Sequence, residues 1–287
     1  MTGEPIDITP RLLRSWALPE PGSSKYERGS VLVVGGATTT PGAVALAGLG
    51  ALRVGAGHLS AAVAQPAAIP LAVALPESGV SPLPATDTGS VSGDRVDLIA
   101  DQLRRADVVV VGPGLDSPEG TVRLLEGLVP LLGADTGLLL DAFALGSLPQ
   151  LASPIERPGR LLLTPNDQEA SRLLERPFEA TPDEVVEIAT RYDAVVACHD
   201  LVATPAGELW RIGSGHAGLA TSGSGDVLSG AIAGIWARGA SPEQAACWGK
   251  HLHTTAGDRL AARVGPLGFL AREIIDELPA VLRELSL

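Results

Sequence analysis

The chain has 287 residues, a length that fits one large α/β domain or two smaller ones. Hydrophobic residues make up 45% of it, a share that supports a buried core and argues against disorder. The net charge is −12 and no run of Lys and Arg is present, so we expect no nucleic-acid partner and no anionic membrane partner. Neither a signal peptide nor an apolar run of about 18 residues is found, so a cytoplasmic location is expected.

The chain repeats one unit, which is a continuous apolar strand, a turn of glycine or proline, and a helix. Residues 1–24 are rich in proline and predict a lead-in segment with one helical turn around Pro10–Trp16. The predicted strands, of which the last two form a hairpin, are 30–34, 58–63, 69–75, 107–111, 137–140, 160–163, 194–197, 201–204 and 208–212. The predicted helices are 41–54, 95–105, 118–132, 166–174, 182–191, 225–237, 242–263 and 269–285.

Strands that are apolar throughout are typical of a parallel sheet covered on both faces. We therefore predict a single α/β domain over residues 1–287, with a mostly parallel central sheet and helices on both faces. In such sheets ligands bind at the carboxyl ends of the strands. The turns that follow predicted strands there are Gly35-Gly36, Gly112-Pro113-Gly114, Asp141, Thr164-Pro165 and the segment before Asp226.

The segment Gly218 to Asp226 is crowded with glycine and small residues and precedes an almost uncharged helix. Free backbone N–H groups around Gly223, Ser224 and Gly225 would form an anion site at the helix N-terminus. Asp226 would then be a general base for a hydroxyl that attacks a phosphoryl group. The structural alternative is an ordinary helix start with Ser224 as the N-cap.

Two further polar positions allow both a structural and a functional role. Asp141 ends a buried strand, where its carboxylate either caps the next helix or contacts a polar ligand or a metal-bound water. Asn166 and Glu169 have the spacing of a capping box, and alternatively Glu169 would hold a magnesium-bound water near phosphates. His251 and His253 lie two apart in a predicted helix and so do not form a metal pair.

Taken in order, these motifs resemble the ADP-dependent NAD(P)H-hydrate dehydratase family, which has the ribokinase-like fold. The resemblance covers about Lys25 to Leu285. Its most specific part is the opening block Lys25–Gly36 with Pro41-Gly42-Ala43 and 52–57. The later matches are 111–115, 140–145, 163–165 and Gly223-Ser224-Gly225-Asp226, which is similar to the family's Gly-Thr-Gly-Asp signature.

The resemblance implies an enzyme that repairs hydrated NADH or NADPH. ADP or ATP, with Mg²⁺, would phosphorylate the ring hydroxyl, and elimination of phosphate would restore the dinucleotide. It further implies that Ala43, Gly114 and Asn166 contact the hydrated dinucleotide, that Gly225 contacts the adenine nucleotide, and that Asp226 takes the hydroxyl proton. A homotetramer is also implied.

Three positions depart from the family pattern. Phe143 stands where a second Asp is usual, and Asn166 stands where His is usual. Cys198–Val202 occupies the place of a Lys-Gly-x-x-Thr nucleotide-binding segment whose Lys, Gly and Thr are absent. Lysine occurs only at Lys25 and Lys250, so the sequence offers no obvious substitute.

Two other functions remain open at this point. A ribokinase-like kinase for a small alcohol would share Asp226 and the anion site but would transfer phosphate without elimination. A catalytically weak nucleotide-binding regulatory protein would fit the departures at Phe143 and Cys198–Val202. The opening block favours the dehydratase over the kinase.

Overall fold

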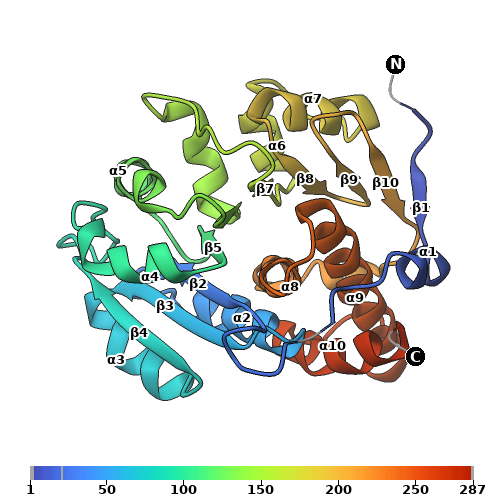
Figure 1. Ribbon diagram of the computed structural model, residues 1–287, viewed down its shortest axis with the longest axis horizontal. Helices are drawn as coiled ribbons and strands as arrows, with labels where there is room; N and C mark the ends of the chain where they lie inside the picture. Colours follow the sequence, from blue (N-terminus) through green and yellow to red (C-terminus); the bar gives the residue numbers. More distant parts are fainter. Residues whose placement is uncertain (1–2, 21, 286–287) are drawn as a thin grey trace.

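A single ten-stranded sheet runs through the computed structural model, which describes residues 3–20 and 22–285 (Figure 1). The strand order is β1-β10-β9-β8-β7-β6-β5-β2-β3-β4. All neighbours are parallel except β9, which is antiparallel to both β8 and β10. The strands are β1 (Ile6–Ile8), β2 (Ser30–Val34), β3 (His58–Ala64), β4 (Ser78–Leu83), β5 (Val108–Val111), β6 (Gly137–Leu140), β7 (Leu161–Leu163), β8 (Val195–Cys198), β9 (Leu201–Ala203) and β10 (Leu209–Ile212).

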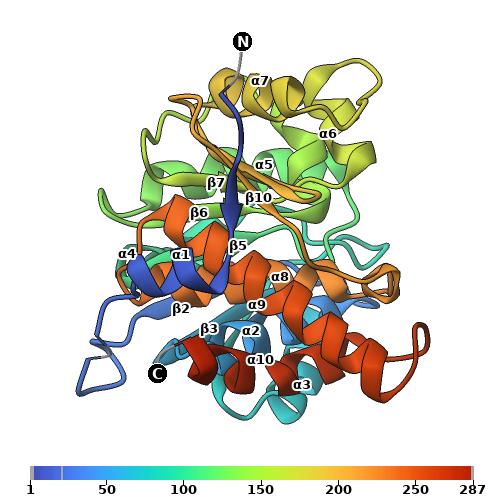
Figure 2. The ribbon, with the colours of Figure 1, turned by 90° about the vertical axis from the view of Figure 1, so that its right-hand side faces the viewer.

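Helices cover both faces of the sheet, as Figure 2 shows, so the predicted mostly parallel sheet between two helix layers is confirmed. One face carries α1 (Pro10–Ser15), α2 (Pro41–Arg53), α3 (Gln65–Ala74), α8 (Ser224–Ala237), α9 (Pro242–Arg263) and α10 (Ala271–Leu285). The other carries α4 (Ala100–Arg105), α5 (Pro118–Leu128), α6 (Asp167–Leu174) and α7 (Pro182–Tyr192). Short 3₁₀ helices are η1 (Val96–Ile99), η2 (Val129–Leu131), η3 (Ala142–Gln150) and η4 (Ala217–Leu219).

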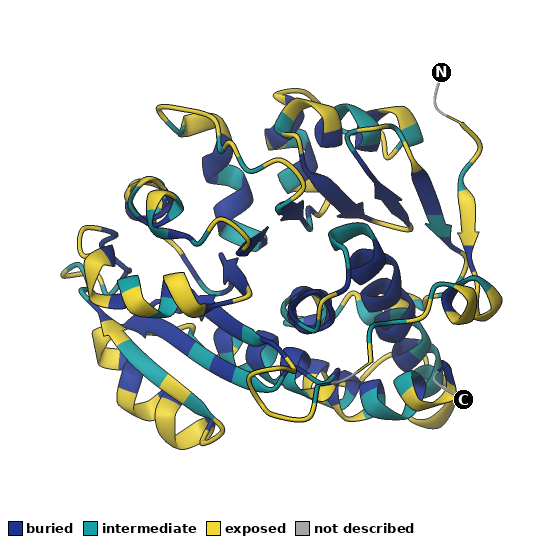
Figure 3. Ribbon diagram, viewed as in Figure 1, coloured by how far each residue is buried: buried dark blue, intermediate teal, exposed yellow. Residues whose placement is uncertain are grey.

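The core lies on both sides of the inner strands, which are buried along most of their length, whereas the edge strands β1 and β4 are mostly exposed or half-buried (Figure 3). In β2, Val31 and Val33 pack into the layer of α8, while Leu32 and Val34 pack into the opposite layer. Small residues let the helices come close, since a Cβ at Gly230 of α8 would lie 1.9 Å from the backbone oxygen of Ala47 in α2. This packing fixes α8 against the sheet and so places its N-terminus at the carboxyl edge of the strands.

The predicted strand at 69–75 is wrong, because this apolar run belongs to helix α3. The β-branched residues favoured a strand, but Ile69 and Val73 are each 78% exposed on the outer side of the helix. Pro66 fits the first turn of a helix, where its missing N–H leaves no bond unmade.

Two of the described strands, β1 and β4, were not predicted, and both lie at the edges of the sheet. Gly79 and Pro82 are atypical of a strand, but β4 pairs only with β3, and an edge strand tolerates proline. At the other edge β1, within the proline-rich lead-in, pairs with β10. The helical turn predicted around Pro10–Trp16 is confirmed as α1. Within the described residues, no helix is both long and apolar enough to cross a membrane.

Candidate active site

The turn after β2 is bonded to the turn after β5, and this brings two of the predicted site residues together. The backbone oxygen of Gly114 accepts from the Ala37 N–H at 2.8 Å and from the Thr40 hydroxyl at 2.7 Å. Gly114 has a φ of +70°, and a Cβ there would lie 3.3 Å from the Cβ of Ala43. Ala43 and Gly114 therefore share one small-residue surface at the carboxyl edge of the sheet.

Asp141, at the end of β6, is a buried carboxyl group. It makes no side-chain capping bond to η3, so the capping alternative is wrong. Its carboxylate instead accepts from the Thr164 hydroxyl at 2.7 Å. Burial raises the pKa of Asp141 to about 6, although hydrogen bonds from Thr164 and Ser229 oppose that rise.

Asp226 lies in the first turn of α8, where no side chain caps the helix. The residue before the helix is Gly223, with a φ of +85°, so the alternative that made Ser224 the N-cap is wrong. Burial raises the pKa of Asp226 to about 7, and the negative charge of Asp141 adds to the rise. A carboxylate with a pKa near 7 beside uncapped N–H groups suits a general base for phosphoryl transfer.

Asn166 and Glu169 form the predicted capping box of α6. The Asn166 side chain accepts from the Glu169 N–H at 3.0 Å, and the Glu169 carboxylate accepts from the Asn166 N–H at 2.9 Å. Burial raises the pKa of Glu169 to about 7; the bond from the Asn166 backbone opposes this rise, and the charge of Asp141 adds to it. Asp141 thus acts electrostatically on both Asp226 and Glu169.

Within residues 3–20 and 22–285, no group of three or more His, Cys, Asp or Glu side chains is arranged to hold a metal ion. The carboxylates of Asp141, Glu169 and Asp226 therefore do not form a ready-made cage. Mg²⁺ commonly keeps several waters and is bound through substrate phosphates and one or two carboxylates. The residues present fit that second arrangement.

A pocket of about 370 Å³ lies at the N-termini of α6 and α8, beside the turn between β8 and β9. The predicted residues Asn166, Ser224 and Gly225 line it. A Cβ at Gly225 would meet nothing within 4 Å, so the backbone is open to a ligand there. The other lining residues are Thr164, Pro165, Asp167, Ala197, His199, Leu219, Leu228, Lys250, His253 and Thr254.

Sequence reasoning gave no site role to the lining residues of α9, among them His253 and Lys250. Nε2 of His253 lies 3.0 Å from both the hydroxyl and the carbonyl oxygen of Ser224, so His253 holds the start of α8 in place. Lys250 lines the same pocket, and its ammonium donates to the backbone oxygen of His199. The sequence offered no obvious substitute for the missing lysine, and the structure places Lys250 beside the turn in which that lysine is absent. The sequence signal for Lys250 was its position as a lone lysine in the otherwise uncharged stretch 244–257.

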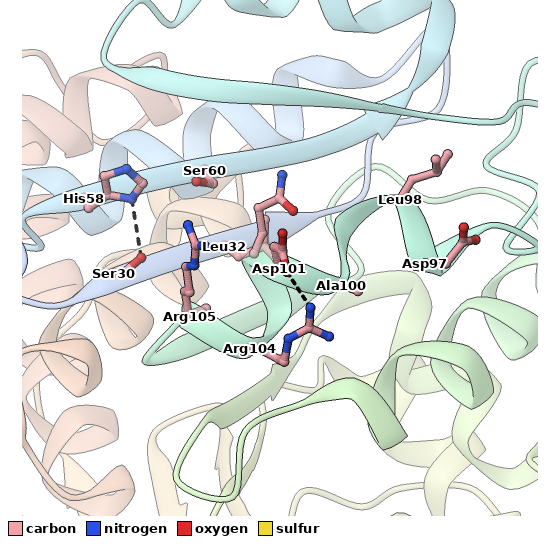
Figure 4. Close-up of a pocket in the computed structure, with 12 residues that line it drawn as sticks. Ser30, Leu32, His58, Ser60, Asp97, Leu98, Ala100, Asp101, Arg104 and Arg105 are labelled. Carbon is pink, nitrogen blue, oxygen red and sulfur yellow. Dashed lines mark hydrogen bonds and ion pairs between the residues drawn. The ribbon is translucent and has the colours of Figure 1, made fainter.

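A larger cavity, of about 510 Å³, lies at the other end of the sheet (Figure 4). It opens beside the first residues of β2 and β3, where the Ser30 hydroxyl is 3.4 Å from Nδ1 of His58. Arg104 and Asp101 of α4, which form an ion pair, also line it. Because strands β2 and β3 start there, this cavity is separate from the carboxyl edge that carries Asp226.

Comparison with known proteins shows which family the chain belongs to. The family model for NAD(P)H-hydrate dehydratase matches residues 31–280. The ADP-dependent (S)-NAD(P)H-hydrate dehydratase of Xanthomonas campestris is 42% identical over 99% of both chains. The bifunctional NAD(P)H-hydrate repair enzyme of Moorella thermoacetica is 37% identical over 90% of this chain, which spans 50% of that longer protein.

Solved structures agree on the fold. The ADP/ATP-dependent NAD(P)H-hydrate dehydratase of Bacillus subtilis, co-crystallised with ATP and Mg²⁺, superposes with a TM-score of 0.82 at 26% identity, covering 98% of each chain. A ribokinase-like superfamily protein of Enterococcus faecalis gives a TM-score of 0.85 at 23% identity, covering 98% of this chain and 96% of that one. The predicted ribokinase-like fold is confirmed, and with the family model matching most of its length, the chain belongs to the NAD(P)H-hydrate dehydratase family.

Proposed function

We propose that this protein repairs nicotinamide dinucleotides by ADP- or ATP-dependent dehydration of (S)-NAD(P)H-hydrate to NAD(P)H. The observation that carries the proposal is Asp226, a half-buried carboxyl group with a pKa raised to about 7 at the uncapped N-terminus of α8. The Xanthomonas campestris relative, named for this activity, matches the whole length of the chain and supports the proposal.

The chemistry follows from the position of Asp226. The carboxylate takes the proton of the ring hydroxyl while the hydroxyl oxygen attacks the terminal phosphorus of the nucleotide. The new O–P bond forms as the bond to the departing nucleotide breaks, which leaves AMP from ADP or ADP from ATP. Phosphate then leaves with the C–O bonding pair, and loss of a proton from the adjacent ring carbon restores the double bond.

The neighbouring residues supply binding and charge stabilisation in this proposal. Ala43, Gly114 and Asn166 contact the hydrated dinucleotide, while the N–H groups of Gly223–Gly225 stabilise the charge on the transferring phosphoryl group. Mg²⁺, held by the nucleotide phosphates with a water near Glu169, would neutralise charge on those phosphates. The small-residue surface of Ala43 and Gly114 and the open backbone at Gly225 support these assignments.

Three further expectations belong to the same proposal. The protein would act in the cytoplasm as a homotetramer, and residues 1–287 would form one domain. The continuous ten-stranded sheet, whose edge strand β1 comes from the lead-in segment, supports the single domain.

The direct test incubates the protein with hydrated NADH, Mg²⁺ and either ADP or ATP, and follows the return of NADH absorbance. The proposal predicts recovery with at least one nucleotide and one AMP or ADP released per NADH formed. A kinase that stops after phosphoryl transfer would release the nucleotide product without restoring NADH. No recovery with either nucleotide would contradict the proposal.

A further inference from the structure

Lys250 is a buried cation that lines the pocket of about 370 Å³. It belongs to helix α9 and not to the turn between β8 and β9. The residue is 5% exposed. Its ammonium donates to the backbone oxygen of His199, which lies in that turn. Lys25, the other lysine of the chain, is exposed and lies over the ring of Tyr26.

The surroundings of Lys250 leave its charge poorly compensated. An ammonium group has three donors, and the one bond recorded here goes to a neutral carbonyl. The two nearby acids already have partners within the described structure, since Asp167 pairs with His199 and Asp200 pairs with Arg211 at 3.1 Å. Burying a cation without a counter-charge is costly, and burial accordingly lowers the pKa of Lys250. An anionic ligand in the pocket would remove this cost.

The opposite side of the pocket also favours an anion. Ser224 and Gly225 line it at the uncapped N-terminus of α8, a helix of 14 residues. Backbone N–H groups and the helix dipole attract phosphate at such a position. Lys250 and the start of α8 therefore line one pocket, in which the lining acid Asp167 is paired with His199.

The turn between the two sides is held in an unusual shape. His199 has a φ of +50°, a left-handed conformation that few residues other than glycine adopt readily. Its ring stacks on Phe178 with centroids 5.8 Å apart and pairs with Asp167. With the bond from Lys250 to its carbonyl, His199 is fixed from three sides, and the ammonium is held at the pocket wall.

We propose that Lys250 binds the phosphate chain of the adenine nucleotide, supplying from α9 the positive charge that the turn between β8 and β9 lacks. This inference rests on the proposed use of ADP or ATP. It concerns a binding residue for the phosphates of that co-substrate. A chain with the Lys-Gly-x-x-Thr segment would carry its lysine in the turn between β8 and β9, whereas this chain would supply the lysine from α9.

The test compares ADP with adenosine, which lacks phosphates, by calorimetry on Lys250→Met. Methionine keeps the length and removes the charge. A charge-assisted hydrogen bond is lost, so the Kd for ADP should rise about 10- to 100-fold, while the Kd for adenosine stays within about twofold of wild type. Lys25→Met is the matched control and should leave both values unchanged.

A structural role for Lys250 would give a different result. If Lys250 only pins the His199 carbonyl, its loss would disturb the pocket, and ADP and adenosine would weaken together. That outcome, or an unchanged Kd for ADP, would overturn the inference. If wild-type protein restores NADH with ADP and Lys250→Met binds ADP normally, this inference alone is overturned and the proposed function stands. Wild-type protein that binds neither ADP nor ATP would remove the nucleotide chemistry as well.

A second measurement uses wild-type protein and does not depend on the variant folding. Isotope-labelled lysine gives NMR signals from only two side chains, and Lys25→Met assigns them. ADP should shift the signal of Lys250 and leave that of Lys25 in place, whereas adenosine should shift neither. An unmoved Lys250 signal at saturating ADP would overturn the inference.

Discussion

Asp226 owes its raised pKa first to burial and second to the negative charge of Asp141, a fully buried carboxylate at the end of β6. The two residues come from segments 85 positions apart in the sequence, joined by the packing of α8 against the sheet. Asp141 is itself held by the Thr164 hydroxyl at 2.7 Å. A base with a pKa of about 7 loses its proton near neutral pH, so its environment sets the pH range of the reaction.

Asp141→Asn should move the pH dependence of the reaction. In the wild-type protein, kcat/KM should fall as the pH drops below about 7, because Asp226 becomes protonated. Removing the charge of Asp141 lowers the pKa of Asp226, so this fall should begin at a lower pH. A pH profile of kcat/KM checks the shift, and an unchanged profile would show that Asp141 does not act on the base.

The same substitution should stabilise the protein in alkaline conditions. The pKa of Asp141 is raised to about 6 on folding, so its contribution to stability is complete below its unfolded pKa of about 3.9 and is lost as pH rises through 6. At pH 8, Asp141→Asn should therefore raise the free energy of unfolding by about 1–3 kcal/mol. Urea unfolding at pH 8 and pH 4 tests this, with little difference expected at pH 4.

Gly225→Ala and Gly230→Ala should separate ligand binding from packing on α8. A Cβ at Gly225 enters open space, so the fold should keep its stability while the affinity for ADP falls, because the methyl group blocks close approach of phosphate. A Cβ at Gly230 would lie 1.9 Å from the Ala47 oxygen, and overpacking of this kind costs about 1–3 kcal/mol. Thermal unfolding and ADP calorimetry on both variants check the contrast; normal ADP binding by Gly225→Ala would argue against a phosphate at this position.

Ala43→Leu should weaken binding of the hydrated dinucleotide without affecting ADP. The larger side chain fills the surface shared with Gly114, so KM for the hydrate should rise about tenfold, a penalty of about 1.4 kcal/mol. Gly42→Ala is the control, because a Cβ there meets nothing within 4 Å. Equal effects of the two substitutions on KM would remove Ala43 from the substrate site.

Glu169→Gln should test the magnesium role apart from the helix cap. Glutamine also completes a capping box, so the stability of α6 should be retained. If Glu169 holds a magnesium-bound water, the Mg²⁺ concentration needed for half-maximal activity should rise several-fold. A titration with Mg²⁺ measures this, and an unchanged requirement would leave Glu169 with the capping role alone.

The central strands and the turns at their carboxyl ends were predictable because each carries a local signal. β5, β6 and β7 are continuous apolar runs, and glycine, aspartate or Thr-Pro follows each of them. The edge strands were not predictable, because their pairing partners lie far away in the sequence and an edge tolerates the proline of β4.

Lys250 and His253 were not predicted as site residues for a related reason. Their role depends on which turn α9 packs beside, and helical periodicity alone does not contain that information. The capping box of Asn166 and Glu169, by contrast, is formed within four residues and was correctly predicted.

The most direct test of the account compares wild-type protein with Asp226→Asn in the restoration of NADH from its hydrate with Mg²⁺ and either ADP or ATP. Asparagine keeps the size of the side chain, and loss of a half-buried carboxylate should not unfold the protein at pH 8. The account predicts that NADH absorbance returns with wild type and that turnover by Asp226→Asn falls by about 10²–10⁴-fold, with ADP binding and thermal unfolding preserved. Turnover near the wild-type rate in the variant would contradict the assignment of Asp226 as the base.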